Sequence, residues 1–288
     1  MPLPFPTSYA FPPGGMPAWD ADPAANGAAF TTAYAFIPAT TMRDITASLL
    51  PGWTHTRAWI IARPLSGFAE TFAQYAVEVK TGGGAITIEP DDTAEGVILV
   101  VEGTGVLGDS GTDYPLAPGS YVYLPPTYSA RSFSLSATRD MKFHWIRRRY
   151  VPVPGGTVPE GAVPGGAVPA LIVTSDEATP ILWMNARQNW GTTRFVDTTD
   201  LAHDMHVNIV TLMPGGRIPF AETHVMEHGL YVLQGTARYL LNTTWHEVGP
   251  GDFMWLRAFC PQACIATGSD PFRYLLYKDV NRHPSLTI

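Results

Sequence analysis

Cysteine is scarce in this 288-residue chain, which contains only Cys260 and Cys264. The two residues lie in a segment that we expect to be a strand, where a rise of about 3.3 Å per residue would separate their Cα atoms by about 13 Å. A disulfide requires Cα atoms within about 7 Å of each other. We therefore expect two reduced, half-buried thiols and no disulfide.

Charged residues are also few. They make up 15% of the chain, against 45% hydrophobic residues, and 27 Gly and 27 Pro supply many turns. This composition is unlike that of an α protein with charged surface helices, and it favours β structure. The net charge of −7 and the lack of any basic run longer than residues 147–149 exclude nucleic acid and anionic membrane surfaces as partners.

Long apolar runs are missing as well. The longest, residues 97–101, is far too short to span a bilayer. No Lys or Arg precedes Arg43, and prolines interrupt the apolar residues near the N-terminus, so the parts of a secretory signal are not found. We expect a soluble, cytoplasmic protein with no membrane partner.

A linker divides the chain into two strand-rich parts. Residues 151–170, VPVPGGTVPEGAVPGGAVPA, repeat Val-Pro and Gly-Gly with almost no charge, which is typical of an extended connection. Apolar, β-branched and aromatic runs bounded by Gly or Pro lie on both sides of it. We predict an N-terminal extension at 1–56, an N-terminal barrel at 57–150, the linker at 151–170 and a C-terminal barrel at 171–288.

The two parts repeat each other. An offset of 132 residues aligns Gly103 with Gly235 and Gly119 with Gly251, and it lays LAPGSYVYL over VGPGDFMWL. Each copy then reads as strand, glycine turn, strand, Pro-Gly turn and strand. Short strands separated by such turns are typical of antiparallel sandwiches and barrels. We predict an all-β fold of two tandem jelly-roll barrels.

The segment ETHVMEHG, residues 222–229, permits two interpretations. On a helix, its letters HVMEH match the HxxEH zinc motif of a peptidase family. Pro219 and Gly229 leave about nine residues for that helix, however, and Thr223 and Val225 are poor helix formers. We therefore favour a strand.

On a strand, Glu222, His224 and His228 share one face, while Glu227 faces away. One carboxylate and two imidazoles inside a barrel would form a metal site. If these three residues were needed for folding, both copies of the repeat should contain them. The residues 132 positions earlier are instead Pro90, Asp92 and Gly96. We interpret the site as a functional addition to the C-terminal barrel and the N-terminal barrel as metal-free and structural.

These segments resemble the cupin motif pair, whose first motif is G…HxHx3-4E…G and whose second supplies a last ligand after a PxG-like turn. Here the first is GGRIPFAETHVMEHGLYVLQG and the second is GPGDFMWLRAFCPQAC. Glu222 stands in the place of the first His, His228 in that of the last Glu, and Gln262 where His is usual. This set is similar to that of the (S)-ureidoglycine aminohydrolase family, which are bicupins. The similarity continues in YLLYKDVNRHP, RRYVPV, VVEG and YLPP, and it covers most of the chain from about residue 57.

The resemblance implies a set of site residues. Mn²⁺ would be bound by a mostly hard donor set that suits it, with Zn²⁺ or Fe²⁺ as alternatives; the ligands would be Glu222, His224, His228 and Gln262. Lys278 would pair with a substrate carboxylate, Tyr239 and Tyr274 would hydrogen-bond a ureido group, and Glu222 would also transfer a proton. Glu222 and Lys278 are thus the candidate catalytic residues.

The implied reaction is hydrolytic release of ammonia from (S)-ureidoglycine to give (S)-ureidoglycolate, in allantoin and purine catabolism. Two alternatives remain: a metal-cupin enzyme of another type, such as a dioxygenase or isomerase acting on a small carboxylate, and a non-catalytic ligand-binding bicupin. A fourth protein ligand at Gln262 argues against oxygen chemistry, which needs room for O₂ at the metal. The resemblance alone implies a homo-oligomer.

Other candidate residues carry less information. His203 and His206 have opposite parity in a predicted strand, so we interpret them as structural, and His144 and His246 have no identifiable partner. Cys260 and Cys264 share parity with Gln262 and are therefore expected to line the cavity.

Overall fold

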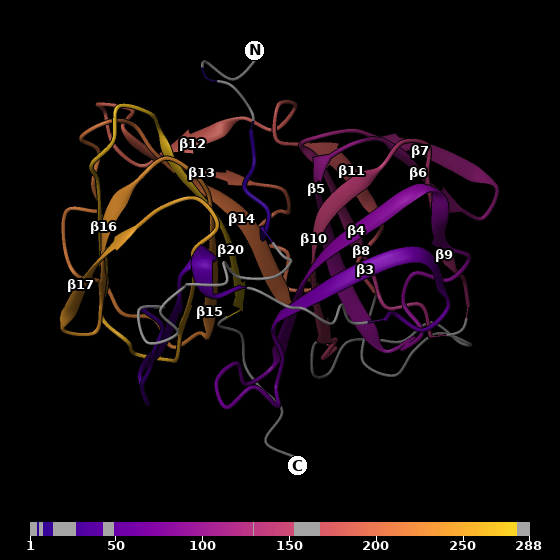
Figure 1. The fold of residues 1–288 in the computed structure, drawn as a ribbon, viewed down its shortest axis with the longest axis horizontal. Helices are drawn as coiled ribbons and strands as arrows, with labels where there is room; N and C mark the ends of the chain where they lie inside the picture. The colour runs from indigo at the N-terminus through magenta and orange to yellow at the C-terminus, as the bar shows by residue number, and fades with distance from the viewer. Residues whose placement is uncertain are drawn as a thin grey trace, which may run out of the picture.

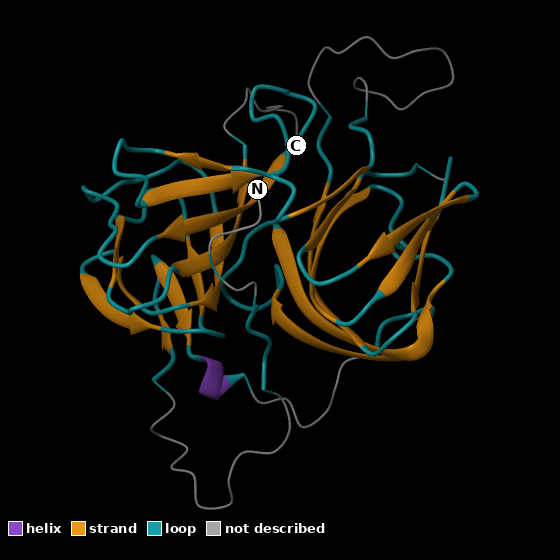
Figure 2. Cartoon of the chain, turned by 90° about the horizontal axis from the view of Figure 1, so that it is seen from above, coloured by secondary structure: helices purple, strands orange, loops and turns teal. Residues whose placement is uncertain are grey.

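The computed structural model describes residue 5 and residues 8–13, 27–42, 49–128, 130–152 and 168–280. This part of the chain is almost entirely β-strand, and its one helical element is the single-turn 3-10 helix η1 (Ala39–Thr41). Two barrels lie side by side (Figure 1), and the view from above shows the curved sheets of each (Figure 2). The predicted all-β fold is confirmed. In the described residues no helix is long and apolar enough to cross a membrane.

The N-terminal barrel is a nine-stranded sheet. Its strand order is β11-β8-β5-β10-β4-β9-β6-β7, and β3 pairs with β4 outside this path. The strands are β3 (Trp53–Ala62), β4 (Phe72–Ala85), β5 (Ala94–Glu102), β6 (Gly105–Asp109), β7 (Thr112–Leu116), β8 (Ser120–Leu124), β9 (Phe133–Ala137), β10 (Met141–Arg149) and β11 (Ile172–Ser175). Strand β3 begins within the segment predicted as an extension, and most of the predicted linker, residues 153–167, lies outside the described residues.

The C-terminal barrel combines two sheets. The larger has the order β1-β2-β18-β15-β20-β14-β13-β12, and the smaller has the order β17-β16-β19. The strands are β1 (Ala29–Phe30), β2 (Tyr34–Ile37), β12 (Ile181–Trp183), β13 (Trp190–Arg194), β14 (Met205–Leu212), β15 (His228–Gln234), β16 (Ala237–Leu241), β17 (Thr244–Val248), β18 (Phe253–Leu256), β19 (Gln262–Ala266) and β20 (Phe272–Asp279).

The predicted duplication is visible in the strand order, because β8-β5-β10-β4 in one barrel corresponds to β18-β15-β20-β14 in the other. The aligned glycines explain why it is readable in the sequence. Gly103 and Gly235 have φ values of 79° and 68°. A Cβ atom on Gly103 would lie 1.8 Å from the carbonyl oxygen of Asp140, and one on Gly235 would lie 2.3 Å from that of Pro271. Only glycine combines this backbone conformation with so close an approach.

Each barrel has an edge covered by a strand from the other part of the chain. Strand β11 follows the predicted linker, yet it pairs with β8 of the N-terminal sheet. Strand β2, from the N-terminal extension, pairs with β18 of the C-terminal sheet. Pairing satisfies the backbone N–H and C=O groups that an edge strand would otherwise expose.

In the part of the chain that the structure describes, three apolar clusters form the core. One fills the N-terminal barrel, one fills the C-terminal barrel, and the third lies between them. At the interface a buried ion pair joins Arg273 of β20 to Asp176 after β11, with Nη2 at 2.7 and 2.8 Å from the two carboxylate oxygens. Tyr9 also donates to Asp176 at 2.8 Å. The two barrels are therefore held together by polar as well as apolar contacts.

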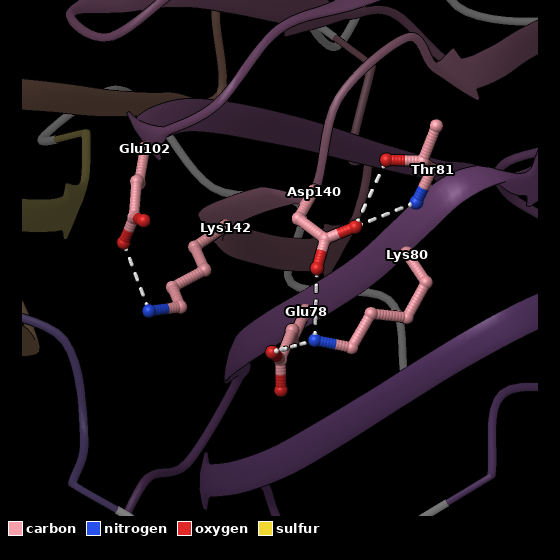
Figure 3. Close-up of polar contacts among 6 residues, drawn as sticks. All are labelled: Glu78, Lys80, Thr81, Glu102, Asp140 and Lys142. Carbon is pink, nitrogen blue, oxygen red and sulfur yellow. Dashed lines mark hydrogen bonds and ion pairs between the residues drawn. The ribbon is translucent and has the colours of Figure 1, made fainter.

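Two groups of exposed ion pairs, around Lys80 and Lys142, lie on the N-terminal barrel (Figure 3). Lys80 donates to Glu78 at 2.8 Å and to Asp140 at 3.0 Å, and Lys142 donates to Glu102 at 2.8 Å. These pairs are solvent-exposed, where each contributes little to stability. We assign them no functional role.

Candidate metal centre and active site

The segment at residues 222–228 is not a helix. Glu222 forms an isolated antiparallel bridge with Gln262, in which each backbone N–H donates to the carbonyl of the other at 2.9 Å. The chain bends at Val225 and Met226, and β15 begins at His228. The extended backbone expected from the sequence is therefore present at both ends of the motif and interrupted between them. The bridge places Glu222 and Gln262 side by side.

The proposed ligands gather around this bridge. Oε1 of Glu222 lies 3.6 Å from Nε2 of His224. The rings of His224 and His228 have centroids 4.9 Å apart. Nδ1 of His228 lies 3.0 Å from the carbonyl oxygen of Met226, which leaves Nε2 as the nitrogen that can bind a metal ion. Burial, followed by the nearby charges of His224 and Lys278, lowers the pKa of His228 to about 3.

The oxygen and nitrogen atoms of these side chains suit a metal ion, but the distances between them are longer than those around a bound ion. Adjacent ligands on an octahedral ion at about 2.1 Å lie about 3 Å apart. Among the described residues no group of three or more His, Cys, Asp and Glu side chains is assembled to hold an ion. The separation of 3.6 Å between Glu222 and His224 shows that side-chain rotation would be needed to close the set. His228 is neutral near pH 7, as an imidazole ligand must be.

Gln262 is oriented by a tyrosine. The hydroxyl of Tyr239, on β16, donates to Oε1 of Gln262 at 2.7 Å. Tyr239 and Tyr274 are both buried, with ring centroids 5.9 Å apart in an edge-to-face arrangement. Burial raises the pKa of both phenols well above the usual value, so both remain protonated hydrogen-bond donors. The oxygen of Tyr239 remains able to accept.

Lys278 lies in a row of polar side chains across three strands. On β20 it pairs with His228 of β15 on one side and with His206 of β14 on the other. Directly paired residues share one face of a sheet. Burial lowers the pKa of Lys278, and Arg194 lowers it further, whereas Glu222 and Asp279 raise it. Lys278 therefore lies close enough to Glu222 for the two charges to interact.

The sequence reasoning did not place two neighbours of Lys278 beside the site: it interpreted His206 as structural and did not consider Arg194. His206 is in direct register with Lys278. Burial, followed by the charge of Lys278 and smaller effects of other charges, lowers the pKa of His206 to about 4. Arg194, at the end of β13, is among the charges that act on both. A small cavity of about 100 Å³ beside this row is lined by His203, His206, Met226 and Lys278, among others. Only the strand register, which no local pattern reveals, could have identified them.

Glu227 faces away from the proposed ligands, as expected, but it is buried and fully engaged. Its carboxylate accepts hydrogen bonds from the N–H groups of Glu70 and Thr71, from the Thr71 hydroxyl and from Nε1 of Trp255, at 2.7 to 2.9 Å. Its own N–H donates to Asp279 at 2.8 Å. Because Glu70 and Thr71 belong to the N-terminal barrel, Glu227 fixes the metal motif against that barrel.

The cysteines and the remaining histidines pack against other residues of the protein. Cys260 and Cys264 are free and buried rather than half-buried, and burial raises the pKa of both thiols. Cys264 pairs with Tyr239 across β16 and β19, so it lines the same apolar interior. Nε2 of His144 lies 3.2 Å from the carbonyl oxygen of Ala10. His246 packs against Tyr34 and Phe36, so each of the two histidines has partners that the sequence did not reveal.

Comparison with known proteins identifies the family. The cupin domain family matches residues 208–277. The (S)-ureidoglycine aminohydrolase of Arabidopsis thaliana is 32% identical over 238 residues, which are 82% of this chain and 73% of that protein. The chain belongs to the (S)-ureidoglycine aminohydrolase family. The family member of Escherichia coli K12 is 28% identical over 236 residues, covering 82% of this chain and 85% of its own.

A solved structure agrees with this assignment. A Pseudomonas aeruginosa protein named as glyoxylate-induced is 51% identical, with a TM-score of 0.85, and the match covers 98% of this chain and 100% of that one. The predicted family and the cupin barrels are thereby confirmed. As a member of the (S)-ureidoglycine aminohydrolase family, the protein is an enzyme with a small-molecule substrate.

Proposed function

We propose that this protein is a Mn²⁺-dependent (S)-ureidoglycine aminohydrolase, which hydrolyses its substrate to (S)-ureidoglycolate and ammonia. The observation that carries the proposal is the backbone bridge between Glu222 and Gln262, which sets a carboxylate and an amide side by side next to His224. The relatives from Arabidopsis thaliana and Escherichia coli support the reaction by their names.

Four side chains would hold the metal: Glu222, His224, His228 and Gln262. Their oxygen and nitrogen atoms suit Mn²⁺, and four ligands leave two octahedral positions for a small molecule. When bound, the ion would supply Lewis acidity and a fixed template for the substrate. Tyr239 keeps the amide oxygen of Gln262 in place through its 2.7 Å hydrogen bond.

The row beside the ligands would bind the substrate carboxylate. Lys278 is the nearest candidate, because it lies between His228 and His206 on the same face of the sheet. Arg194 adds to the positive charge there. Tyr274 would donate to the ureido oxygen. The hydroxyl proton of Tyr239 is already directed to Gln262, so its oxygen would accept from a ureido N–H.

Glu222 would transfer the proton that the reaction requires. In the reaction the oxygen of water bonds to the Cα atom of the substrate, the bond from Cα to the amine breaks, and the amine leaves as ammonia with one added proton. A carboxylate beside the reacting carbon can accept the proton of the water and deliver it to the amine. Lys278 lies close enough to this carboxylate for the two charges to interact, so it would place a positive charge beside Glu222.

The test is metal analysis of the purified protein, followed by assays with freshly generated (S)-ureidoglycine. Protein stripped and reloaded with Mn²⁺, Zn²⁺ or Fe²⁺ is compared for ammonia release above the spontaneous rate and for the handedness of the product. We expect the Mn²⁺ form to be the most active and to yield the (S) product. A fully loaded protein that releases no ammonia above the spontaneous rate would contradict the proposal and leave another metal-cupin reaction.

A further inference from the structure

The N-terminal barrel contains a cavity of about 490 Å³ that the proposed reaction does not use. This volume is typical of sites for small molecules. The residues that line it include Pro90, Asp92 and Gly96, which are the residues that the offset of 132 aligns with the metal-binding motif. The cavity therefore occupies the same place in its barrel as the candidate metal site does in the other. Both copies of the repeat thus have a site at this position, but different side chains form it.

Trp145 presents a buried donor to this cavity. Its side chain lines the cavity and is only 1% exposed, and its Nε1 has no hydrogen-bond partner among the described residues. Nε1 lies 3.0 Å from the position that a Cβ atom would take on Gly96. Gly96 aligns with His228, so the indole N–H faces the space that an imidazole has in the other barrel. Buried N–H groups nearly always have an acceptor.

The arginines around the cavity are already paired with carboxylates. Arg147 forms a bidentate ion pair with Glu89 and donates to the hydroxyl of Tyr75 at 3.2 Å. Arg131 donates through Nη2 to Asp109 at 2.7 Å, while its Nε is a second buried donor without a partner. Among the described residues that line the cavity, no unpaired guanidinium is thus available to hold an anion.

The acceptors of the cavity are carboxylates. Glu89 and Asp92 both line it. A carboxylate has about four acceptor sites, so each can accept hydrogen bonds in addition to those it makes within the protein. A ligand with a negative charge would be repelled by both. A neutral ligand with N–H groups would be attracted.

We propose that this cavity is a second ligand site, for a small neutral molecule that carries a carbonyl group beside N–H groups, such as an amide, a urea or a ureide. The carbonyl oxygen accepts from Nε1 of Trp145 and Nε of Arg131, and the N–H groups of the ligand donate to Asp92 and Glu89. The site is separate from the candidate metal centre, and it does not depend on the proposed reaction.

Calorimetric titration of the full-length protein tests this site, with hydantoin and N-methylurea as neutral probes and acetate as an anionic one. We expect dissociation constants on the order of 1 mM for the neutral probes, and no displacement of these probes by acetate. Binding of acetate in place of the neutral probes would overturn the proposed ligand class. A lack of any binding at about 20-fold higher concentration would overturn the site itself.

Variants locate the bound probe. Trp145→Phe keeps an aromatic side chain, although a smaller one, and removes the N–H, so it should weaken hydantoin binding about tenfold, whereas the matched change Trp190→Phe in the other barrel should not. Asp92→Ala, which leaves the indole intact, should weaken binding severalfold and serves if Trp145→Phe fails to fold. His224→Ala should leave binding unchanged. Equal binding by folded Trp145→Phe protein, or loss of binding in His224→Ala, would place the probe elsewhere and overturn the proposal.

Discussion

Glu227 in the C-terminal barrel and Thr71 in the N-terminal barrel are joined by two hydrogen bonds of 2.9 Å, one from the N–H and one from the hydroxyl of Thr71. Glu227 immediately precedes His228, a proposed metal ligand, and its N–H donates to Asp279, the residue after Lys278. His228 and Lys278, on different strands, are thus each next in the chain to a residue of the pair that this backbone hydrogen bond joins. The barrel without the ligand set therefore supports the barrel that has it.

Replacing Glu227 by Gln should lower both stability and activity. The amide has one acceptor oxygen where the carboxylate has two, and its NH₂ group would face backbone N–H donors. Hydrogen bonds to a buried charged group contribute roughly 1.5 to 3 kcal/mol each, so we expect a loss of roughly 2 to 3 kcal/mol in the free energy of unfolding. Thermal unfolding and ammonia release measure the two effects.

Glu247→Gln is the control for this change. Glu247 is exposed and forms a surface ion pair with Arg238 at 3.2 Å. Its replacement should change the free energy of unfolding by less than about 0.5 kcal/mol. If Glu227→Gln behaved like Glu247→Gln, the contact between the barrels would have no part in positioning the site.

Glu222→Gln should separate metal binding from catalysis. An amide oxygen can still bind Mn²⁺ weakly, but it cannot accept a proton, and general acid-base catalysis is worth about 100- to 10,000-fold in rate. We therefore expect kcat to fall at least about 100-fold while a substantial part of the metal is retained. Metal content and ammonia release are measured on the same preparation. Full turnover by the variant would rule out the proton-transfer role.

Tyr239→Phe should weaken metal binding without removing a ligand. The hydroxyl orients Oε1 of Gln262, and loss of a residue that orients a ligand commonly costs 10- to 100-fold in metal affinity. We expect a higher dissociation constant for Mn²⁺ in a competition assay with a chelator. Tyr114→Phe, in the N-terminal barrel, should leave the affinity unchanged. An unaltered affinity in Tyr239→Phe would mean that Gln262 needs no such support.

Acid should destabilise the protein partly through His144. Burial lowers the pKa of this histidine from 6.5 to about 4 in the folded state. Between these values the unfolded chain binds the proton and the folded protein does not, so stability is full above about pH 6.5 and falls as the pH drops toward 4. The shift corresponds to roughly 3 kcal/mol. Thermal unfolding at several pH values should show a smaller acid loss for His144→Gln than for the unchanged protein, and an equal loss would contradict this assignment.

The sequence predicted those parts of the site that depend on residues close together in the chain. Parity along a strand was enough to bring Glu222 and His224 together, and glycines with positive φ made the duplication readable. Glu70 and Thr71, the partners of Glu227 in the N-terminal barrel, lie more than 150 residues away in the chain. The position of His206 beside Lys278 depends on the register between β14 and β20. Neither kind of long-range pairing leaves a local pattern, which is why both were missed.

Strands β11 and β2 each complete the sheet of a barrel from the other part of the chain, and this limits which fragments could be expressed separately. A fragment limited to the N-terminal barrel would end before β11 and expose the edge of β8, and one that began after the linker would carry β11 without its sheet and lack β2 on β18. The chain contains two copies of the repeat, but neither copy alone contains every strand of its own barrel. Gene fission between them would yield two polypeptides that have to find each other before either barrel is complete.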